Sequence, residues 1–483
     1  MRKFPRTVCA ALATLIASSA SWNVQAWDKW DAFKASNVNE SFRVVDHSDK
    51  RKITTSEGQS YAMFFALVAG DKTSFEKLLK WTEDNLAGGD LTKRKPAWLW
   101  GKNGSAWNII DGNNAADSDM WIAYCLLEAG RLWNRPDYTE KAKAMIELLK
   151  KDVRDVKGLG KVLLPGFKGF ERDAFVTLNP SYYPIFIMRR FAQEDAEWSA
   201  VIEGTVRALV RSAPRGYAPD WVRFDRQGKV VPEKGDDYVL GSYNAIRTYM
   251  WAAMLSPADP VHDVLTEQFE PFVKMTRETQ MPPEKVNVLT GERFGTGSTG
   301  FAACVLELLG PGATQSYLRN VIENDPIVGE NYYRNTLLLF AIGFDRGLFR
   351  FDRNGYLILA DKTVLTAVPP KAAESTEEQS QSETSEPHGG QNAEDKQDAE
   401  PQDKAEPGKS VEQPGLTKSE TAPEAKPLTA AQTPVSAQDQ TQPASESESK
   451  QSAKTAEASA PADAPKPAAT AAAQNETTQG TTK

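Results

Sequence analysis

The sequence predicts an all-α fold, an (α/α)6 barrel of two concentric helix rings, followed by a disordered C-terminal tail. Three observations predict it. Apolar stretches rich in small residues alternate with charged amphipathic stretches between residues 27 and 365. The first five apolar stretches recur about every 60 residues. Residues 366–483 contain no Phe, Trp or Tyr, so they cannot form an aromatic core.

Residues 1–26 have the pattern of a secretory signal peptide. A basic start, with Arg2 and Lys3, precedes an apolar run over 8–20, and Val24 and Ala26 are small residues at the positions that signal peptidase reads. The run is too short to cross a bilayer as a mature helix. We therefore expect cleavage after residue 26, export to the periplasm and no stable membrane insertion.

The expected inner helices are apolar, and the expected outer helices are amphipathic. Within 120–133, Trp121, Cys125 and Ala129 recur at helical spacing among other apolar residues. Segment 140–151 instead turns several charged side chains toward water. Inner helices are expected to begin near 58, 118, 181, 242, 299 and 331, and outer helices to cover 73–86, 138–151, 197–212 and 262–278.

An ordinary helical solenoid is the alternative to a barrel, but common solenoid repeats are shorter than this period. The extra length lies in loops, where functional sites are often built. Almost no long strand is expected, and the short apolar piece 356–359 is a candidate for a short one.

The charge of the chain is concentrated in its tail. From residue 370 onward there are 20 acidic and 10 basic residues, whereas the whole chain has a net charge of −8. Such a tail cannot bury enough apolar surface to offset its conformational entropy. The predicted domain 27–365 is therefore almost neutral, which argues against nucleic acid as a partner and fits an uncharged substrate.

Two cysteines, Cys125 and Cys304, lie in apolar helical stretches of the predicted mature chain. An oxidising compartment permits a disulfide between them. Two separately buried thiols are the favoured interpretation.

Several tryptophans are expected in loops rather than on periodic helix faces. These are Trp98, Trp100, Trp107 and Trp221. An aromatic ring can stack on the apolar face of a sugar while polar groups bind its hydroxyls. Each one taken alone fits a core position better, but the group favours a carbohydrate-binding cleft.

Glu57 opens an apolar helix and is followed by small residues. It can complement the helix dipole in the first turn. It can also act as a general acid, because partial burial keeps a carboxyl group protonated. Glycoside hydrolysis generally uses two such carboxyl groups.

Asp117 and Asp119 open the second inner helix, where capping is the simpler role. A metal site is disfavoured because the chain has three His, none of them nearby. No metal and no other cofactor is expected.

Six sequence blocks, in this order, resemble glycoside hydrolase family eight (cellulase family D), and more closely its periplasmic members encoded with bacterial cellulose synthases. The resemblance spans about residues 27–345 and excludes the tail. The blocks are 52–61, 96–101, 116–133, 179–182, 219–223 and 282–286.

The resemblance implies an inverting endo-β-1,4-glucanase with an (α/α)6 barrel. We expect the protein to be a monomer. Its substrate would be a cellulose chain and its partner a cellulose synthase and export complex. By position, Glu57 matches the proton donor, and Asp117 matches the aspartate that holds the distorted sugar. Tyr182 and Arg247 match residues around the reacting sugar and water. Trp98, Trp121 and Trp221 are the candidate sugar platforms.

Asn244 departs from the family pattern, because close relatives have the general base, an aspartate, at this position. An amide cannot take up the proton of water at neutral pH. Three interpretations stay open. Asp237, or its neighbour Asp236, supplies the base; Asn244 only positions water in a slow enzyme; or the protein binds glucan without cutting it.

The same fold acting on chitosan or xylan is a further alternative, although a near-neutral domain suits cationic chitosan poorly.

Overall fold

The structure is a computed structural model that describes residues 27–231 and 236–360, all of them within one compact unit. The predicted signal peptide, 1–26, and the predicted tail, 366–483, lie outside the described residues. None of the described helices combines the length and the apolar character that a bilayer crossing requires.

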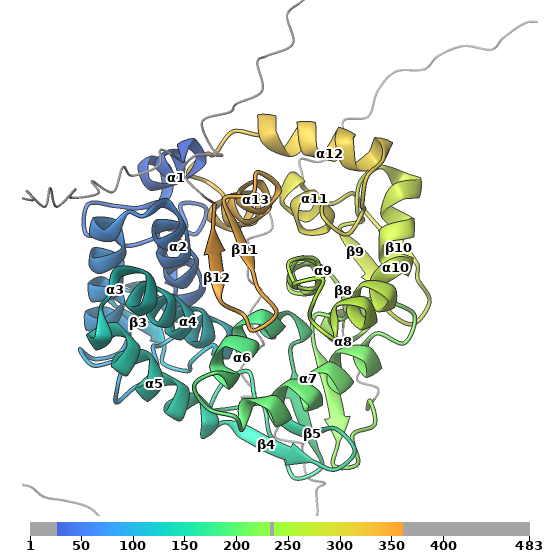
Figure 1. The fold of residues 1–483 in the computed structure, drawn as a ribbon, viewed down its shortest axis with the longest axis horizontal. Coiled ribbons are helices and arrows are strands. Elements are labelled where there is room, and N and C mark those ends of the chain that lie inside the picture. The colour runs from blue at the N-terminus through green and yellow to red at the C-terminus, as the bar shows by residue number, and fades with distance from the viewer. Residues whose placement is uncertain (1–26, 232–235, 361–483) are drawn as a thin grey trace, which may run out of the picture. The chain divides into compact units, whose positions relative to one another are not determined.

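Helices in two rings form the body of the described chain (Figure 1). The inner ring contains α2 (Ser56–Ala69), α4 (Ala116–Trp133), α6 (Ile185–Ala192), α9 (Ile246–Ala253), α11 (Thr299–Val305) and α13 (Tyr332–Asp345). The outer ring contains α1 (Asp28–Asn37), α3 (Lys72–Leu86), α5 (Pro136–Lys150), α7 (Trp198–Ser212), α10 (His262–Thr279) and α12 (Ala313–Asn324). The predicted (α/α)6 barrel is confirmed.

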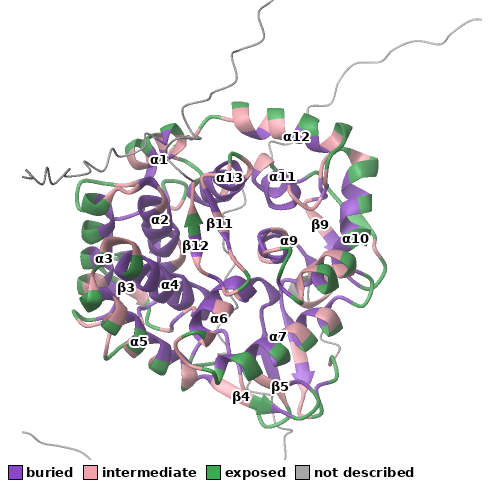
Figure 2. Cartoon of the chain, viewed as in Figure 1, coloured by how far each residue is buried: buried purple, intermediate pink, exposed green. Residues whose placement is uncertain are grey.

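Burial separates the two rings as the sequence pattern indicates. In Figure 2 the inner helices are almost wholly buried, and the outer helices expose one face. The four predicted outer helices agree with α3, α5, α7 and α10 to within two residues at each end. Helices α1 and α12 were not predicted. The apolar positions of α1 make a weak helical period, whereas those of α12 are as periodic as those of α3, so α12 was missed although its signal was present.

Short antiparallel strands occupy the loops between helices. The longest are β2 (Leu99–Asn103) and β3 (Ala106–Asp111), which form a sheet in the order β1-β2-β3 with β1 (Thr54–Thr55). The expectation of almost no long strand is confirmed for the described residues, where no strand exceeds six residues, but the short strands outside 356–359 were not singled out. The remaining elements are η1 (Pro180–Tyr182), α8 (Asp236–Val239), β4 (Val153–Val156), β5 (Gly160–Leu163), β6 (Phe175–Leu178), β7 (Val222–Asp225), β8 (Leu240–Gly241), β9 (Lys285–Asn287) and β10 (Arg293–Phe294).

A hairpin of β11 (Phe349–Phe351) and β12 (Leu357–Leu359) follows α13 and lies inside the ring of inner helices (Figure 1). Phe351 stacks on Phe186 of α6 with ring centroids 3.9 Å apart. At the hairpin turn, Gly355 has φ +80°, and a Cβ there would lie 1.9 Å from the Phe186 carbonyl oxygen. Only glycine fits this position. The hairpin fills the barrel at the end where α13 finishes.

Glu128 of α4 anchors this hairpin from a fully buried position. Its carboxylate accepts hydrogen bonds from Arg190 Nε at 2.7 Å, from the backbone N–H of Leu357 at 2.9 Å and from Arg131 Nε at 3.0 Å. The buried charge is thereby paired and fully bonded, as stability requires.

Cys125 and Cys304 are both free and buried, which confirms the favoured interpretation of the two cysteines as core residues.

Candidate active site

Glu57 lies in the first turn of α2, at the end of the barrel opposite the hairpin. The Thr55 side chain caps this helix by accepting the N–H of Gly58 at 3.0 Å. The rest of α2 is apolar and packed in the core, which fixes the helix axis. The Glu57 side chain itself remains 17% exposed. The helix thus presents one carboxyl group that solvent, and hence substrate, can reach.

The guanidinium of Arg247, on α9, contacts most of the predicted polar residues. It forms an ion pair with Glu57 and donates to Asn244 Oδ1 at 3.2 Å. It also donates to Ser181 Oγ at 3.1 Å, and it lies 3.9 Å from Asp117 Oδ2. Three predicted residues, together with Ser181, which was not singled out, therefore meet at one cation that is itself only 3% exposed.

Asp117 lies in the first turn of α4, and burial raises the pKa of its carboxyl group to about 7. The backbone N–H of Ser118 donates to Asp117 Oδ1 at 2.7 Å and partly opposes that rise. Its other oxygen faces Arg247. The carboxyl group is thus able to change its charge near neutral pH.

Asp119 belongs to a different environment from Asp117. Asn114 Nδ2 donates to Asp119 Oδ2 at 2.6 Å, and Oδ1 has no hydrogen-bond partner. Burial raises the pKa of Asp119 to about 8. Residues two positions apart on a helix point in different directions, so Asp117 and Asp119 do not face the same site. Within the described ranges no three His, Cys, Asp or Glu side chains group as metal ligands.

Tyr182 lies beside Arg247, as predicted. It ends η1, and its ring centroid lies 6.0 Å from the guanidinium carbon of Arg247. It is half-buried, with its ring edge-on to that of Trp221 at 6.0 Å.

Asp220 is a structural partner of the site that sequence reasoning did not single out. Its Oδ1 accepts the backbone N–H groups of Ser242, Asn244 and Ala245 at 2.9, 3.0 and 2.7 Å. These bonds fix the turn that leads into α9 and so orient Asn244 and Arg247. The sequence did contain a signal for Asp220, because this residue lies in the block 219–223 that resembles the family.

Tyr332, at the start of α13, is a second residue that was missed. Its hydroxyl lies 3.1 Å from Thr55 Oγ1 and donates to Glu57 Oε1 at 3.4 Å. It therefore contacts both the cap of α2 and the carboxyl group that this cap positions.

Asn244 points its side-chain oxygen at Arg247, so it is at the site but offers no basic group. Asp237 has its backbone in α8, close in sequence to this turn, but its side chain lies outside what the structure describes. The role predicted for Asp237 stays a prediction.

Trp121 is not a sugar platform, contrary to expectation. It is fully buried, one helical turn below Asp117, as Tyr61 is below Glu57 and Trp251 below Arg247. The ring centroids of Trp121 lie 5.8 Å from Tyr61 and 5.4 Å from Trp251. Because residues four apart stack along one helix face, the three rings form the floor beneath the polar site.

Trp221 also differs from the prediction. It is 4% exposed, and Phe170 stacks flat against its ring at 5.6 Å, so the ring offers no open face. Trp98 is half-buried, and its carbonyl accepts the N–H of Ser56, next to Glu57. A platform role for Trp98 remains a prediction.

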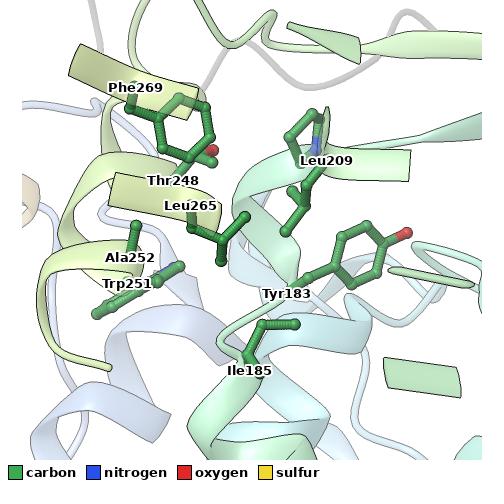
Figure 3. A pocket seen from close by; sticks show the side chains of 9 residues that line it. Tyr183, Ile185, Leu209, Thr248, Trp251, Ala252, Leu265 and Phe269 are labelled. Carbon is green, nitrogen blue, oxygen red and sulfur yellow. The ribbon is translucent and has the colours of Figure 1, made fainter. Parts of the chain in front are cut away.

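A small pocket lies elsewhere, among helices α6, α7, α9 and α10 (Figure 3). Its lining is mainly apolar and includes Ile185, Leu209 and Leu265. No carboxyl group lines it, so we interpret it as a packing gap and place the chemistry at Glu57.

Two inner helices thus bring one acidic side chain each to the same cation, and glycoside hydrolysis generally uses such a pair of carboxyl groups. The sequence model described as Glycosyl hydrolases family 8 matches residues 2–347. The chain belongs to this family.

Relatives and solved structures agree with that assignment. An endoglucanase of Escherichia coli (strain K12) is 42% identical over 344 residues, which cover 70% of this chain and 93% of the relative. An endoglucanase of Xanthomonas axonopodis pv. citri is 39% identical, covering 73% of this chain and 94% of the relative. The crystal structure of an endo-1,4-D-glucanase from Vibrio fischeri is 39% identical, with a TM-score of 0.66, covering 70% of this chain and all of that one.

Proposed function

We propose that this glycoside hydrolase is an endo-β-1,4-glucanase that cuts cellulose-type chains with inversion of the anomeric carbon. The observation that carries the proposal is the meeting of Glu57 and Asp117, from two inner helices, at the guanidinium of Arg247. The endoglucanase names of the similar proteins support the choice of substrate.

Glu57 is the general acid of the proposed reaction. It gives its proton to the glycosidic oxygen as the bond between that oxygen and the anomeric carbon breaks. In the structure Arg247 pairs with Glu57. Asp117 lies 3.9 Å from the same guanidinium, so Arg247 can pair with Asp117 when the substrate oxygen takes its place beside Glu57.

Asp117 stabilises the positive charge that develops on the distorted sugar. An ionised carboxylate close to an oxocarbenium-like transition state lowers its energy without a covalent bond. Arg247 supports this role, because a nearby cation favours the ionised form of Asp117 against its buried surroundings.

The base that activates water is Asp237 in this proposal. Water attacks the anomeric carbon from the face opposite the leaving oxygen, and its proton passes to the base. Asn244 orients that water through its amide, with the Asp220 bonds holding its backbone in place. The position of α8, just ahead of the turn into α9, supports Asp237 and its neighbour Asp236 as candidates.

Asn244 also favours a second candidate function. Without a base, the same site would bind a glucan and leave it uncut. Cello-oligosaccharides would then bind in calorimetry and be recovered intact after long incubation.

We place the activity in the periplasm, beside a complex that exports cellulose. The signal-peptide pattern of residues 1–26 and the similarity of blocks 52–61 and 116–133 to enzymes encoded with cellulose synthases support this location. The near-neutral charge of the folded part suits an uncharged chain.

The viscosity of carboxymethylcellulose tests the proposed activity. An endo-acting enzyme cuts inside chains, so the wild-type protein should lower viscosity quickly while few reducing ends appear. Glu57→Gln should leave the viscosity almost unchanged. If the wild-type protein also leaves it unchanged, or if Glu57→Gln matches the wild type, the proposal is wrong.

A further inference from the structure

We infer that Trp107, on the β2–β3 hairpin, is an outlying binding platform for the β-glucan chain, beyond the residues that surround the scissile bond. This inference rests on the proposed function, because it extends the same substrate along the surface. Trp107 is 49% exposed, whereas Trp121 and Trp221, two of the three predicted platforms, are buried.

The exposed ring is held in one orientation. Trp107 stacks on Trp100 with ring centroids 5.4 Å apart and an interplanar angle of 23°. Trp100 is itself braced edge-on by Trp81 of α3 at 5.3 Å. A ring that is fixed before binding loses little conformational entropy when a ligand stacks on it.

Arg43 completes this support. Its guanidinium carbon lies 4.9 Å from the Trp100 ring and 5.2 Å from the Trp107 ring. The same group is tied down by hydrogen bonds to the Lys52 carbonyl at 2.6 Å and to Thr54 Oγ1 at 2.9 Å. The arginine is 7% exposed, so it acts as a fixed cation beside the two rings rather than as a mobile surface charge.

The hairpin is continuous with the site. Strand β2 pairs with β1, directly before Glu57, with Thr55 opposite Leu99. Further along β2, Lys102 is opposite Trp107. Lys102 lies four positions after Trp98, whose carbonyl accepts the N–H of Ser56, and four steps span about 13 Å at the usual rise of a strand. A glucan chain that extends a few sugars beyond the cleaved bond would cover that distance.

The surroundings of Trp107 favour a sugar over an apolar protein partner. All residues from Lys102 to Asn108 are exposed, and Trp107 and Ala106 are the only apolar ones among them. A single aromatic face among polar groups suits a ligand with apolar ring faces and hydroxyl edges. An apolar protein surface would need a larger continuous patch.

The test compares full-length wild type, Trp107→Ala and Trp107→Phe on polymeric and short substrates. For Trp107→Ala we expect the KM for carboxymethylcellulose to rise about three- to tenfold with kcat unchanged, because one stacking contact is lost. Cleavage of cellotetraose, which is too short to span the hairpin, should stay at the wild-type rate. Trp107→Phe should fall between the two.

Tyr317→Ala is the matched control, since Tyr317 is aromatic, 50% exposed and located on the outer helix α12. It should leave every parameter unchanged. Retention in gels that contain hydroxyethylcellulose repeats the comparison without catalysis, so it applies even if the wild-type protein cuts nothing. Equal retention and equal KM for Trp107→Ala and wild type would overturn the inference while leaving the proposed function intact, as would an equal loss in Tyr317→Ala.

Discussion

Arg247 shares its positive charge between two acidic side chains, and this sharing determines the chemistry available at the residue scale. Glu57 is partly exposed and paired, whereas Asp117 is buried, with its pKa raised to about 7 by burial. Burial favours the proton on Asp117, whereas the proposed role of Asp117 needs the charged carboxylate, so the two roles depend on Arg247 pairing with Asp117 instead of Glu57 when substrate binds. Neither role follows from residue type alone, because both residues occupy ordinary first-turn helix positions.

Asp119→Asn should change how stability depends on pH. Burial raises the pKa of Asp119 from 3.8 to about 8, so the native state holds this proton more tightly than the unfolded chain does. The contribution of Asp119 therefore falls as pH rises from about 4 to about 8. Asparagine does not titrate. The melting temperature of Asp119→Asn should gain a few degrees on the wild type between pH 5 and pH 8.

Asp84→Asn, at an exposed position of α3, provides the control for this titration and should follow the wild-type curve. Parallel curves for Asp119→Asn and wild type would show that Asp119 is not held protonated in the native state.

Asp237→Asn should lower kcat on cellohexaose by about 10²–10⁴-fold if Asp237 is the base, with KM little changed. Asp236→Asn is the matched control in the same helix and should retain activity. A loss in Asp236→Asn instead would move the base by one residue. Activity in both variants would mean that neither aspartate activates the water.

At the scale of elements, three inner helices, α2, α4 and α9, carry a polar side chain in the first turn and an aromatic ring one turn below. Glu57, Asp117 and Arg247 stand above Tyr61, Trp121 and Trp251, and the β11–β12 hairpin fills the barrel beneath these rings. The site is thus rigid because its supports are core residues. Helical periodicity predicted that these helices are buried, but not which end of each faces the substrate, so Trp121 was wrongly assigned to the sugar.

Glu128→Ala should destabilise the protein by about 3 kcal/mol, because it leaves the buried Arg190 with Glu194 as its remaining carboxylate partner and the Leu357 N–H unbonded. Urea unfolding followed by circular dichroism measures the change. Glu140→Ala, which removes an exposed partner of Lys143 on α5, should cost less than about 1 kcal/mol. Equal losses in the two variants would mean that the hairpin anchor contributes no special stability.

At the scale of the whole molecule, the alternation of apolar and amphipathic stretches was enough to predict the two rings. The bounds of α3, α5, α7 and α10 could be predicted because apolar residues recur regularly along amphipathic helices. The contacts that build the site could not be predicted from local sequence patterns. Tyr332 meets Glu57 across 275 positions and Asp220 caps a turn 24 positions away, and no local pattern encodes such pairings.

Removal of the chain after residue 368 should leave the melting temperature and the activity unchanged. The composition of 366–483 provides no aromatic residue to pack against the barrel, so its loss should expose no core. Differential scanning calorimetry and carboxymethylcellulose assays on the shortened and full-length proteins measure both quantities. A clear fall in either would show that the tail contributes to the folded domain.

Product analysis on cellohexaose, with wild type and Glu57→Gln side by side, tests the central claim most directly. We expect the wild type to yield shorter cello-oligosaccharides whose new reducing ends first appear as the α-anomer by NMR, and Glu57→Gln to yield almost none. Intact cellohexaose after incubation with the wild type, or the same products from Glu57→Gln, would contradict the assignment of Glu57 as the acid of an inverting glucanase.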